Sequence, residues 1–454
     1  MAGTVSRTTG WPRWALALAT MLGLAACSPP VAHLGSGHAL KVWRAASVPQ
    51  PAGPAAVAPG LDAQELVRRA LEHDPALRAL RAEVASIEAG VGLARERGEL
   101  EVRLSQFRLD DVRERRAGVE LAVRARPVRP REVPANIATA RLEADAARAE
   151  LREAEILLAG EIRRLHADLR IAEDEAAIAQ DELALRDEER AIVASRLAAG
   201  AGTALDVALS QLSSAELAAD AAAPVDASNP QLRRLRTHLG LAPDAPMDLT
   251  GAPGGVDAPA AEAMVAEAMI AEALAQHPLV NRAEAQLAGA AVEAWRAPAD
   301  AWPWFSFVQV DYDAVPQPNA SSESKPYRFG FALGINIPLW QWSGASVRAA
   351  RAQQVHRQLA FEATVFEVAA EVQVALAEVR VARERLATIE SVLLPAAQVA
   401  ADEARKARAQ SALDPMRALQ LQNARLKARR LHAAARRELA HALIGLDEVL
   451  GRRP

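Results

Sequence analysis

The residues of this chain that could carry chemistry are one cysteine, nine histidines and many carboxylates. The histidines are scattered, and the sequence has no HExxH pair, no glycine-rich phosphate loop and no serine in a nucleophile elbow. His73 and His277 lie beside prolines in repeated positions, which favours structural roles at turns. The carboxylates have arginines three or four residues away, a pattern typical of solvated helix faces. The sequence therefore predicts no catalytic residue, no cofactor and no metal site, and it argues against an enzyme.

The single cysteine has a position typical of covalent attachment to lipid. Arg7 and Arg13 precede an apolar stretch, Trp14–Leu24, and the residues Leu-Ala-Ala then lead directly to Cys27. This arrangement is that of a targeting segment, and its end resembles the lipobox of bacterial lipoproteins. The alternative is an ordinary signal peptide with an incidental cysteine.

The lipobox resemblance sets the expected organisation of the N-terminus. It implies that residues 1–26 are a signal peptide and that Cys27 is acylated, with palmitate. Residues 27–60 are rich in Pro, Ala and Gly, which predicts a lipid-anchored tether. Ser28 after the cysteine implies sorting to the outer membrane.

The charge balance excludes one class of partner. The chain has 53 basic and 57 acidic residues, a net charge of −4, and removal of the two arginines in residues 1–26 makes it −6. A net negative charge does not favour binding to nucleic acid. No stretch after Leu24 reaches the roughly 18 apolar residues of a transmembrane helix. Any membrane crossing must then be made by strands in a closed barrel.

The aromatic residues are concentrated in one island. Eleven of the 17 lie between Trp295 and Trp342. Residues 303–313 and 327–337 alternate between an apolar parity and a small or polar parity, as transmembrane β-barrel strands do. A soluble sheet packed on a helix is the alternative for this island alone. The side chains expected to face lipid are Trp304, Val308, Val310, Tyr312, Tyr327, Phe329, Phe331 and Leu333.

The two halves of the chain resemble each other. Three landmarks recur in the same order, displaced by about 205 residues, which predicts two repeats, 61–241 and 266–450, joined by a linker, 242–265. The landmarks are Ala70–Pro75 and Ala273–Pro278, Ala204-Leu205-Asp206 and Ala412-Leu413-Asp414, and Leu239-Gly240-Leu241 and Ile444-Gly445-Leu446.

Each repeat is predicted to contain a short helix, a second helix from the proline, a hairpin, a long helix and a final helix. In the first repeat the hairpin is expected at 99–107 with 118–126, and the last two helices at 136–199 and 205–240. In the second repeat the last two helices are expected at 343–411 and 414–450. The Ala-rich long helices are suited to close packing side by side, as in a coiled-coil wall.

Two such repeats behind a lipobox resemble the TolC-like outer-membrane efflux channels. The resemblance rests on the Leu-x-x-x-Pro entry to each repeat, on Ile337-Pro338-Leu339-Trp340 after the second hairpin, and on the glycine-rich tip at 200–206. It implies a mainly α fold with a small β part. In this fold three chains form an α-helical barrel, and each chain gives four strands to one 12-stranded transmembrane barrel.

The resemblance also implies a function and a location. The expected protein is the passive exit duct of a tripartite system in the outer membrane, with its helical domain in the periplasm. Its expected partners are a second and third copy of the chain, outer-membrane lipid, a periplasmic adaptor and an inner-membrane pump of the RND or ABC type. The alternative is a lipid-anchored periplasmic helical scaffold that has lost the pore.

The chain departs from the family pattern in three places, two of them at the tip of the second repeat. The first hairpin is rich in arginine, and its alternating face is only about five to seven residues long, whereas a spanning strand needs ~9–11. Its arginines Arg113–Arg116 either line a pore or form a solvated loop, and we favour the loop. The second departure is at the tip of the second repeat, residues 407–414, which has no glycine, so its turn should differ from the first.

The same tip holds the expected channel aperture. The family commonly narrows its aperture with two acids three residues apart; Asp414 matches the first, and Arg417 stands at the second. Three-fold symmetry would turn each into a ring, which would allow salt bridges between chains. Asp206 is the first-repeat counterpart of Asp414, with two open interpretations: an aperture residue or a helix cap.

Overall fold

The computed structural model describes residues 60–96, 98–110, 115–221, 229–242, 245–255, 265–314, 327–337, 344–410 and 412–453, all within one compact unit, Pro54–Pro454. The signal peptide, Cys27, the tether up to residue 59, and residues 338–340 of the motif after the second hairpin lie outside the described residues. No helix in the described ranges combines the length and the apolar character that crossing a membrane requires.

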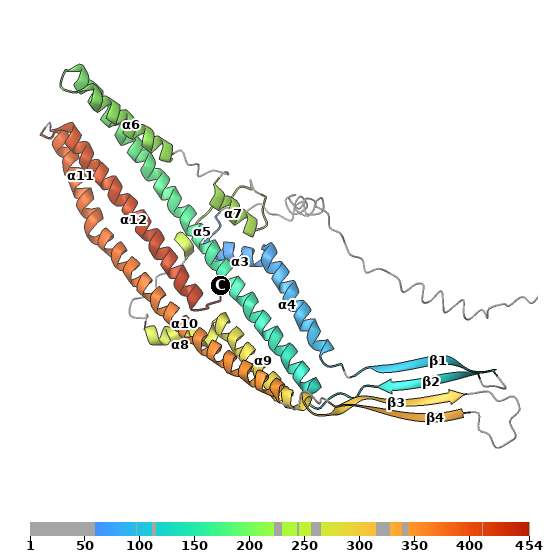
Figure 1. Cartoon of the computed structure of the whole chain (residues 1–454). Helices are drawn as coiled ribbons and strands as arrows, with labels where there is room; N and C mark the ends of the chain where they lie inside the picture. The colour runs from blue at the N-terminus through green and yellow to red at the C-terminus, as the bar shows by residue number, and fades with distance from the viewer. Residues whose placement is uncertain are drawn as a thin grey trace, which may run out of the picture. The chain divides into compact units, whose positions relative to one another are not determined.

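The same order of elements occurs twice (Figure 1). The first set is α3 (Ala63–His73), α4 (Pro75–Leu93), β1 (Leu100–Asp110), β2 (Arg115–Ala125), α5 (Glu132–Ala198), α6 (Ala204–Ala221) and α7 (Pro230–His238). A 3₁₀ turn, η1 (Pro253–Gly255), lies between the two sets. The second set is α8 (Ala266–Gln276), α9 (Pro278–Asp300), β3 (Trp304–Ala314), β4 (Tyr327–Asn336), α10 (Ala345–Thr388), η4 (Ile389–Leu393), α11 (Leu394–Ala409) and α12 (Pro415–Val449).

Local chemistry explains where the first helices begin. The Asp62 carboxylate accepts a hydrogen bond from the backbone N–H of Glu65 at 2.8 Å and caps α3. Asp74 accepts one from Leu77 N–H at 2.9 Å and caps α4, whose first residue is the expected proline. His277 occupies the corresponding cap of α9. The predicted helix starts at Pro75 and Pro278 are confirmed.

Two helix predictions were wrong in part. The single final helix expected at 205–240 is two helices, because α6 ends at Ala221 and α7 begins at Pro230, where Asn229 caps it. The long run expected at 343–411 contains a π-helical turn, η4, before Pro395. Proline has no N–H to donate within a helix, which accounts for a break in the regular α-helical bonding at this place.

The core is divided between the repeats. One cluster joins α3, α4, α5 and α7 around Leu66, Ile162 and Leu235. A second cluster joins α8, α9, α10 and α12 around residues such as Val372 and Leu446. A third, smaller cluster, Leu185 with Leu419 and Leu426, packs α5 against α12 nearer the tip. Each repeat therefore has its own core, and α5 and α12 tie the two together.

The strands form one antiparallel sheet in the order β1-β2-β3-β4, so that β2 and β3 join the repeats. The short first hairpin was a wrong prediction, because β1 and β2 have 11 residues each. The basic residues near its turn extend the ladder rather than a loop: Arg108 pairs with Ala117 and Leu109 with Arg116. Of the arginines assigned to a solvated loop, Arg115 and Arg116 belong to β2, whereas Arg113 lies outside the described residues.

Candidate functional site

One face of the sheet is apolar in all four strands as far as the row of Val119, apart from Gln106, which pairs with Val119 near the first turn. The register places Val102, Val123, Val310 and Phe331 in one row across the sheet. Phe329 is 74% exposed and Leu104 73%, so no other part of the described fold covers these side chains. The members of this apolar face are Leu100, Val102, Leu104, Val119, Leu121, Val123, Phe305, Val308, Val310, Tyr312, Tyr327, Phe329, Phe331, Leu333 and Ile335.

The opposite, polar face carries charges of both signs. Three rows cross it: Glu101 with Arg124, Gln309 and Ala332; Arg103 with Ala122, Asp311 and Gly330; and Ser105 with Glu120, Asp313 and Arg328. The Ser105 hydroxyl donates to Glu120 at 2.8 Å, and the Arg124 guanidinium lies 3.9 Å from the centre of the Phe307 ring. A sheet that is apolar on one face and charged on the other fits lipid outside and water inside.

Trp304 is the one predicted lipid-facing residue that the register places elsewhere. A β-bulge between Phe305 and Phe307 inserts an extra residue and reverses the alternation before it. Phe305 pairs with Ile335 and therefore lies on the apolar face, whereas Trp304 pairs with Asn336 on the other face. The Trp304 indole N–H donates to the carbonyl of Pro127 at 3.0 Å. Its role in the structure is to join the two repeats.

Aromatic side chains lie toward both ends of the β3–β4 hairpin. Near its turn, Tyr312 lies 5.1 Å from Phe329 and 6.5 Å from Tyr327, measured between ring centres. At the helix end Trp302 is 71% exposed, and Trp295 is also exposed. Two aromatic bands that flank an apolar band are typical of barrels at the two membrane–water boundaries.

The helix end of the sheet is held by contacts that the sequence did not reveal. Arg131 adopts a left-handed backbone conformation, with φ of 70°, immediately before α5. Its guanidinium donates to the carbonyl of Trp295 at 2.8 Å and lies 4.8 Å from the centre of that indole ring. Gly344 has the same conformation before α10, with φ of 66°. Superposing the repeats by sequence could have found this position, because glycine marks it in the second copy.

At the other end of α5, Asp206 closes the first helical tip. The Thr203 backbone N–H and hydroxyl donate to the Asp206 carboxylate at 2.9 and 2.8 Å, and Asp206 N–H donates back to the Thr203 hydroxyl at 3.2 Å. This reciprocal arrangement is a capping box at the start of α6. The hydrogen bonds from Thr203 lower the pKa of the Asp206 carboxyl. Of the two interpretations left open by the sequence, the structure shows the cap.

The second tip places Asp414 and Arg417 within one turn of each other. Asp414 precedes Pro415, the first residue of α12, and its side chain makes no cap hydrogen bond. Both side chains are exposed, and within the described ranges neither takes part in an ion pair. The two charges are therefore available to a neighbouring molecule, and the missing cap distinguishes this tip from the first.

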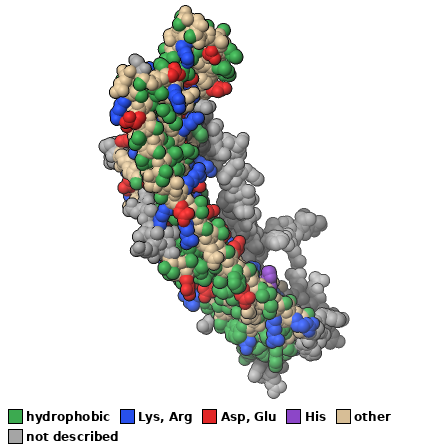
Figure 2. All heavy atoms as spheres, turned by 90° about the vertical axis from the view of Figure 1, so that its left-hand side faces the viewer, with side chains coloured by type: hydrophobic (Ala, Val, Ile, Leu, Met, Phe, Trp, Pro, Cys, Tyr) green, Lys and Arg blue, Asp and Glu red, His purple; other side chains and the backbone are tan. Residues whose placement is uncertain are grey.

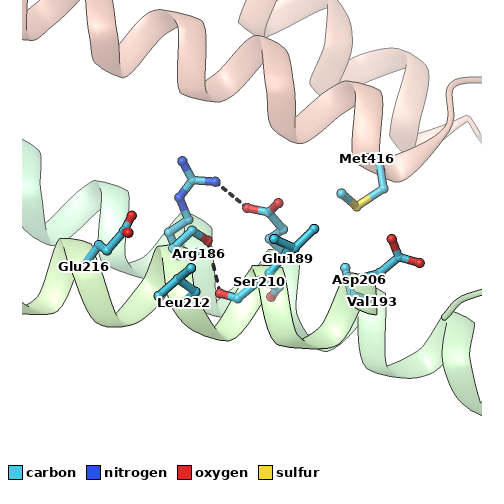
Figure 3. Close-up of a pocket in the computed structure, with 10 residues that line it drawn as sticks. Arg186, Glu189, Val193, Asp206, Ser210, Leu212, Glu216 and Met416 are labelled. Carbon is cyan, nitrogen blue, oxygen red and sulfur yellow. Dashed lines mark hydrogen bonds and ion pairs between the residues drawn. The ribbon is translucent and has the colours of Figure 1, made fainter. Parts of the chain in front are cut away.

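A groove separates the two tips. It has a volume of about 470 Å³ and is lined by residues of α5 and α6 and by Met416 of α12. Figure 3 shows Met416 extending from α12 toward Asp206 and Glu189, and the ion pair of Glu189 with Arg186 at 2.6 Å. Asp206 and the first turn of α12 thus border the same groove, although they belong to different repeats.

A ladder of ion pairs connects α5 to α12 below this groove. Five of these pairs have the acid on α5 and the base on α12: Asp181 with Arg429, Glu182 with Arg430, Asp174 with Arg436, Glu175 with Arg437, and Asp168 with His441. Farther from the tips the polarity reverses, with Arg163 and Arg164 of α5 pairing with Asp447 and Glu448 of α12. Charges of both signs are also interspersed with hydrophobic side chains on the face in Figure 2. In the described part of the chain, no group of three or more His, Cys, Asp or Glu residues is arranged to hold a metal ion.

Solved structures and one family model resemble this chain. CusC, studied for the conformational changes that accompany its folding and transmembrane channel formation, is 18% identical with a TM-score of 0.70, covering 89% of this chain and 95% of its own. The outer membrane protein VceC from Vibrio cholerae is 16% identical with a TM-score of 0.68, covering 86% and 96%. The open state of the Neisseria gonorrhoeae MtrE outer membrane channel is 17% identical with a TM-score of 0.64, covering 86% and 88%. No curated protein sequence matches the chain.

The two-faced sheet and the long helices thus define the fold of TolC-like outer-membrane channels, and the predicted fold class is confirmed. The sequence evidence lies in the second repeat, where residues 269–452 match the family model described as Outer membrane efflux protein. The family is one of channels rather than enzymes.

Proposed function

We propose that this protein is a passive exit duct in the outer membrane, through which small molecules from an inner-membrane pump leave the cell. The observation that carries the proposal is the sheet, whose exposed apolar face and charged opposite face suit lipid on one side and water on the other. Strands of 10 and 11 residues are long enough for the hydrocarbon layer. The scaffold alternative depended on a short first hairpin, which this chain does not have.

The working form of the duct is a homotrimer. In the described structure β1 and β4 each pair along one edge only, and open edges are not tolerated in lipid. Three copies would give the 12 strands that the family resemblance implies. Exposed apolar side chains along α10, η4 and α11 would pack against a second copy, and hydrophobic side chains run along this face in Figure 2. They are Val355, Leu359, Phe366, Val374, Val381, Val392 and Val399.

The periplasmic partners belong to the tip. We assign the groove between α6 and α12 to a periplasmic adaptor protein, which would link the duct to a pump of the RND or ABC type. The groove is open and contains both charged and apolar side chains, as expected for a surface that binds and releases another protein.

The aperture is assigned to Asp414 and Arg417. In a trimer three copies of each would surround one axis, and opposite charges from neighbouring chains would pair across it. The variant with both Asp414→Ala and Arg417→Ala should raise the open probability in bilayers and increase vancomycin entry into cells. Unchanged conductance together with unchanged entry would remove this assignment. Asp206 supports the aperture indirectly, because its capping box fixes the turn of the neighbouring tip.

Lipid attachment at Cys27 has its own test. The variant Cys27→Ser should lose metabolic labelling with palmitate, whereas Ser28→Ala should keep it. Persistent labelling of Cys27→Ser would contradict acylation at this residue. The trimer should survive the change, because the barrel itself holds the protein in the membrane.

The decisive experiment measures mass and conductance on the same sample. Protein extracted from outer membranes in mild detergent should have the mass of three chains and should conduct in planar bilayers. Trimers that stay silent even in the Asp414→Ala, Arg417→Ala variant would reject the duct and favour the scaffold.

A further inference from the structure

The linker between the repeats is fastened to the helices at a buried histidine. Residues 248–254, here termed the docked linker, begin with a short parallel bridge: the N–H of Leu61 donates to the backbone carbonyl of Asp248 at 3.0 Å, and the N–H of Thr250 donates to the carbonyl of Leu61 at 2.9 Å. The docked linker then passes between α5 and α12. A side chain at Gly254 would meet Ile444 of α12 at 3.2 Å and Ala167 of α5 at 3.7 Å. The linker therefore occupies the seam where the two repeats meet.

His166 on α5 makes the central contacts of this seam. Its side chain is fully buried. Nε2 lies 3.0 Å from the carbonyl oxygen of Thr250, and the N–H of Gly254 donates to Nδ1 at 3.2 Å. A carbonyl can only accept and an amide N–H can only donate, so the ring must carry its proton on Nε2 and be neutral. Protonated His166 would present a second N–H toward the N–H of Gly254, and that contact would be lost.

The surroundings of His166 as a whole lower its pKa and so disfavour its protonation. Burial is the main cause that lowers its pKa; Arg170 lowers it further, while Asp62, ahead of α3, and the Thr250 carbonyl act in the opposite direction. On the α12 side, Asp447 is engaged by Arg163 at 3.7 Å. The described hydrogen bonds of the His166 ring go to backbone groups only, so they include no carboxylate that would compensate a charged imidazole.

A second buried histidine has the same kind of bond. His277 caps α9, and its Nδ1 accepts a hydrogen bond from Leu279 N–H at 3.2 Å. Burial lowers the pKa of His277 as well. The charges of the elements packed around it are matched to each other, with Arg452 binding Glu272 of α8 at 2.9 Å and Asp447 of α12 at 3.1 Å. The first repeat has Asp74 at this cap, which accepts the corresponding bond without needing a neutral imidazole.

We propose that the docked linker is an acid-sensitive catch between the two repeats, released when His166 is protonated, with His277 acting in the same direction at the start of α9. An opened histidine titrates near pH ~6.5. The neutral ring is required in the closed state, so the catch is fully closed above that pH and weakens as the pH falls below it. The closed fraction thus responds to acidification of the compartment around the helices.

Hydrogen exchange of the detergent-solubilised trimer tests the catch. Exchange of the Gly254 region, corrected for the intrinsic pH dependence of amide exchange, should rise from pH 7.5 to pH 5.0 by at most about 30-fold, because each pH unit below ~6.5 favours opening by up to about tenfold while the closed ring stays neutral. His166→Gln keeps a donor and an acceptor but does not titrate, so its exchange should not respond to pH. His356→Gln, at an exposed position on α10, is the matched control and should behave as the unaltered protein does.

The outcomes separate clearly. Equal pH responses in the unaltered protein and in His166→Gln would overturn the proposal, as would a Gly254 region whose exchange is independent of pH. If His166→Gln does not assemble, His166→Asn provides the same non-titrating pair of groups. For the second histidine, His277→Asn should abolish the acid-dependent exchange at the first turn of α9 and leave the response of the docked linker in place.

Discussion

Single residues at the first tip show how a charge can serve structure rather than transport. Asp206 → Ala should speed hydrogen exchange of the amides at the start of α6, because both donors of Thr203 lose their acceptor. Asp206→Asn retains an oxygen acceptor and should show a smaller increase. Acid should also weaken the cap. Its contribution to stability is complete above the ordinary pKa of an aspartate, near ~3.9, and is lost as the pH falls through the lowered pKa of Asp206. If Asp206→Ala altered the ion selectivity of the channel and left hydrogen exchange at the start of α6 unchanged, Asp206 would be an aperture residue rather than a cap.

Elements are joined by residues whose backbone is as important as their side chain. Arg131 holds a left-handed conformation between β2 and α5, which costs a non-glycine residue roughly 1–2 kcal/mol. Its contacts with Trp295 offset that cost. We expect Arg131→Ala to lower the thermal midpoint of the trimer more than Arg131→Gly, because alanine loses the contacts and keeps the strain. The reverse order would show that the left-handed backbone at residue 131 stores no strain that glycine relieves. Gly344→Ala should also destabilise the trimer, because alanine adopts the left-handed conformation of this position less readily than glycine does.

The ion-pair ladder between α5 and α12 contains a matched pair of tests. Glu182 is buried and pairs with Arg430, whereas its neighbour Asp181 is exposed and pairs with Arg429. Glu182→Gln should destabilise more than Asp181→Asn, because it removes the charge of a buried carboxylate and leaves the Arg430 guanidinium without its partner. Asp181→Asn should cost no more than about 1 kcal/mol. Chemical or thermal unfolding in detergent measures both. Equal effects would mean that burial does not set the strength of this ladder.

At the scale of the whole molecule, the question is which face of the sheet meets lipid. Val310 and Gln309 are neighbours in β3 with side chains on opposite faces. Val310→Arg should destabilise the inserted barrel by about 2–4 kcal/mol if it lies near the middle of the bilayer. Gln309→Arg should be tolerated, because its face already carries Arg124 and Arg103. Folding into lipid vesicles followed by denaturant titration compares the two variants. Equal stability would contradict the membrane orientation.

Much of this architecture could be predicted because hydrophobic periodicity and the residues that begin helices are local properties of the sequence. Alternation gave β3 and β4 nearly to the residue, and prolines gave the starts of α4 and α9. The bulge before Phe307 could not be predicted, since one extra residue in a ladder depends on the partner strand. For the same reason the arginines near the first turn were assigned to a loop, although pairing with the opposite strand extends β1 and β2 through them.

The tips were predictable in position but not in chemistry. The repeated Leu-Asp placed Asp206 and Asp414 correctly at the two turns. Only Asp206 makes cap hydrogen bonds, because Thr203 both donates to its carboxylate and accepts from its N–H. His277 was expected to serve a turn, and it does cap α9. His166 gave no sequence signal, because its partners are backbone groups of a distant segment.

The π-helical turn before Pro395 makes the chain unequally tolerant of changes in length. A π-turn accommodates one residue more than an α-helical turn, so deleting a single residue within Ile389–Leu393 could restore regular α-helix. Because the wider turn already absorbs one residue, α11 would keep the same face toward α12 after that deletion, and the second tip would stay in place. In α5, which is α-helical over 67 residues, the loss of one residue would rotate the helix beyond it by about 100°, the angle per residue of an α-helix. The two repeats therefore differ in their tolerance of the loss of one residue.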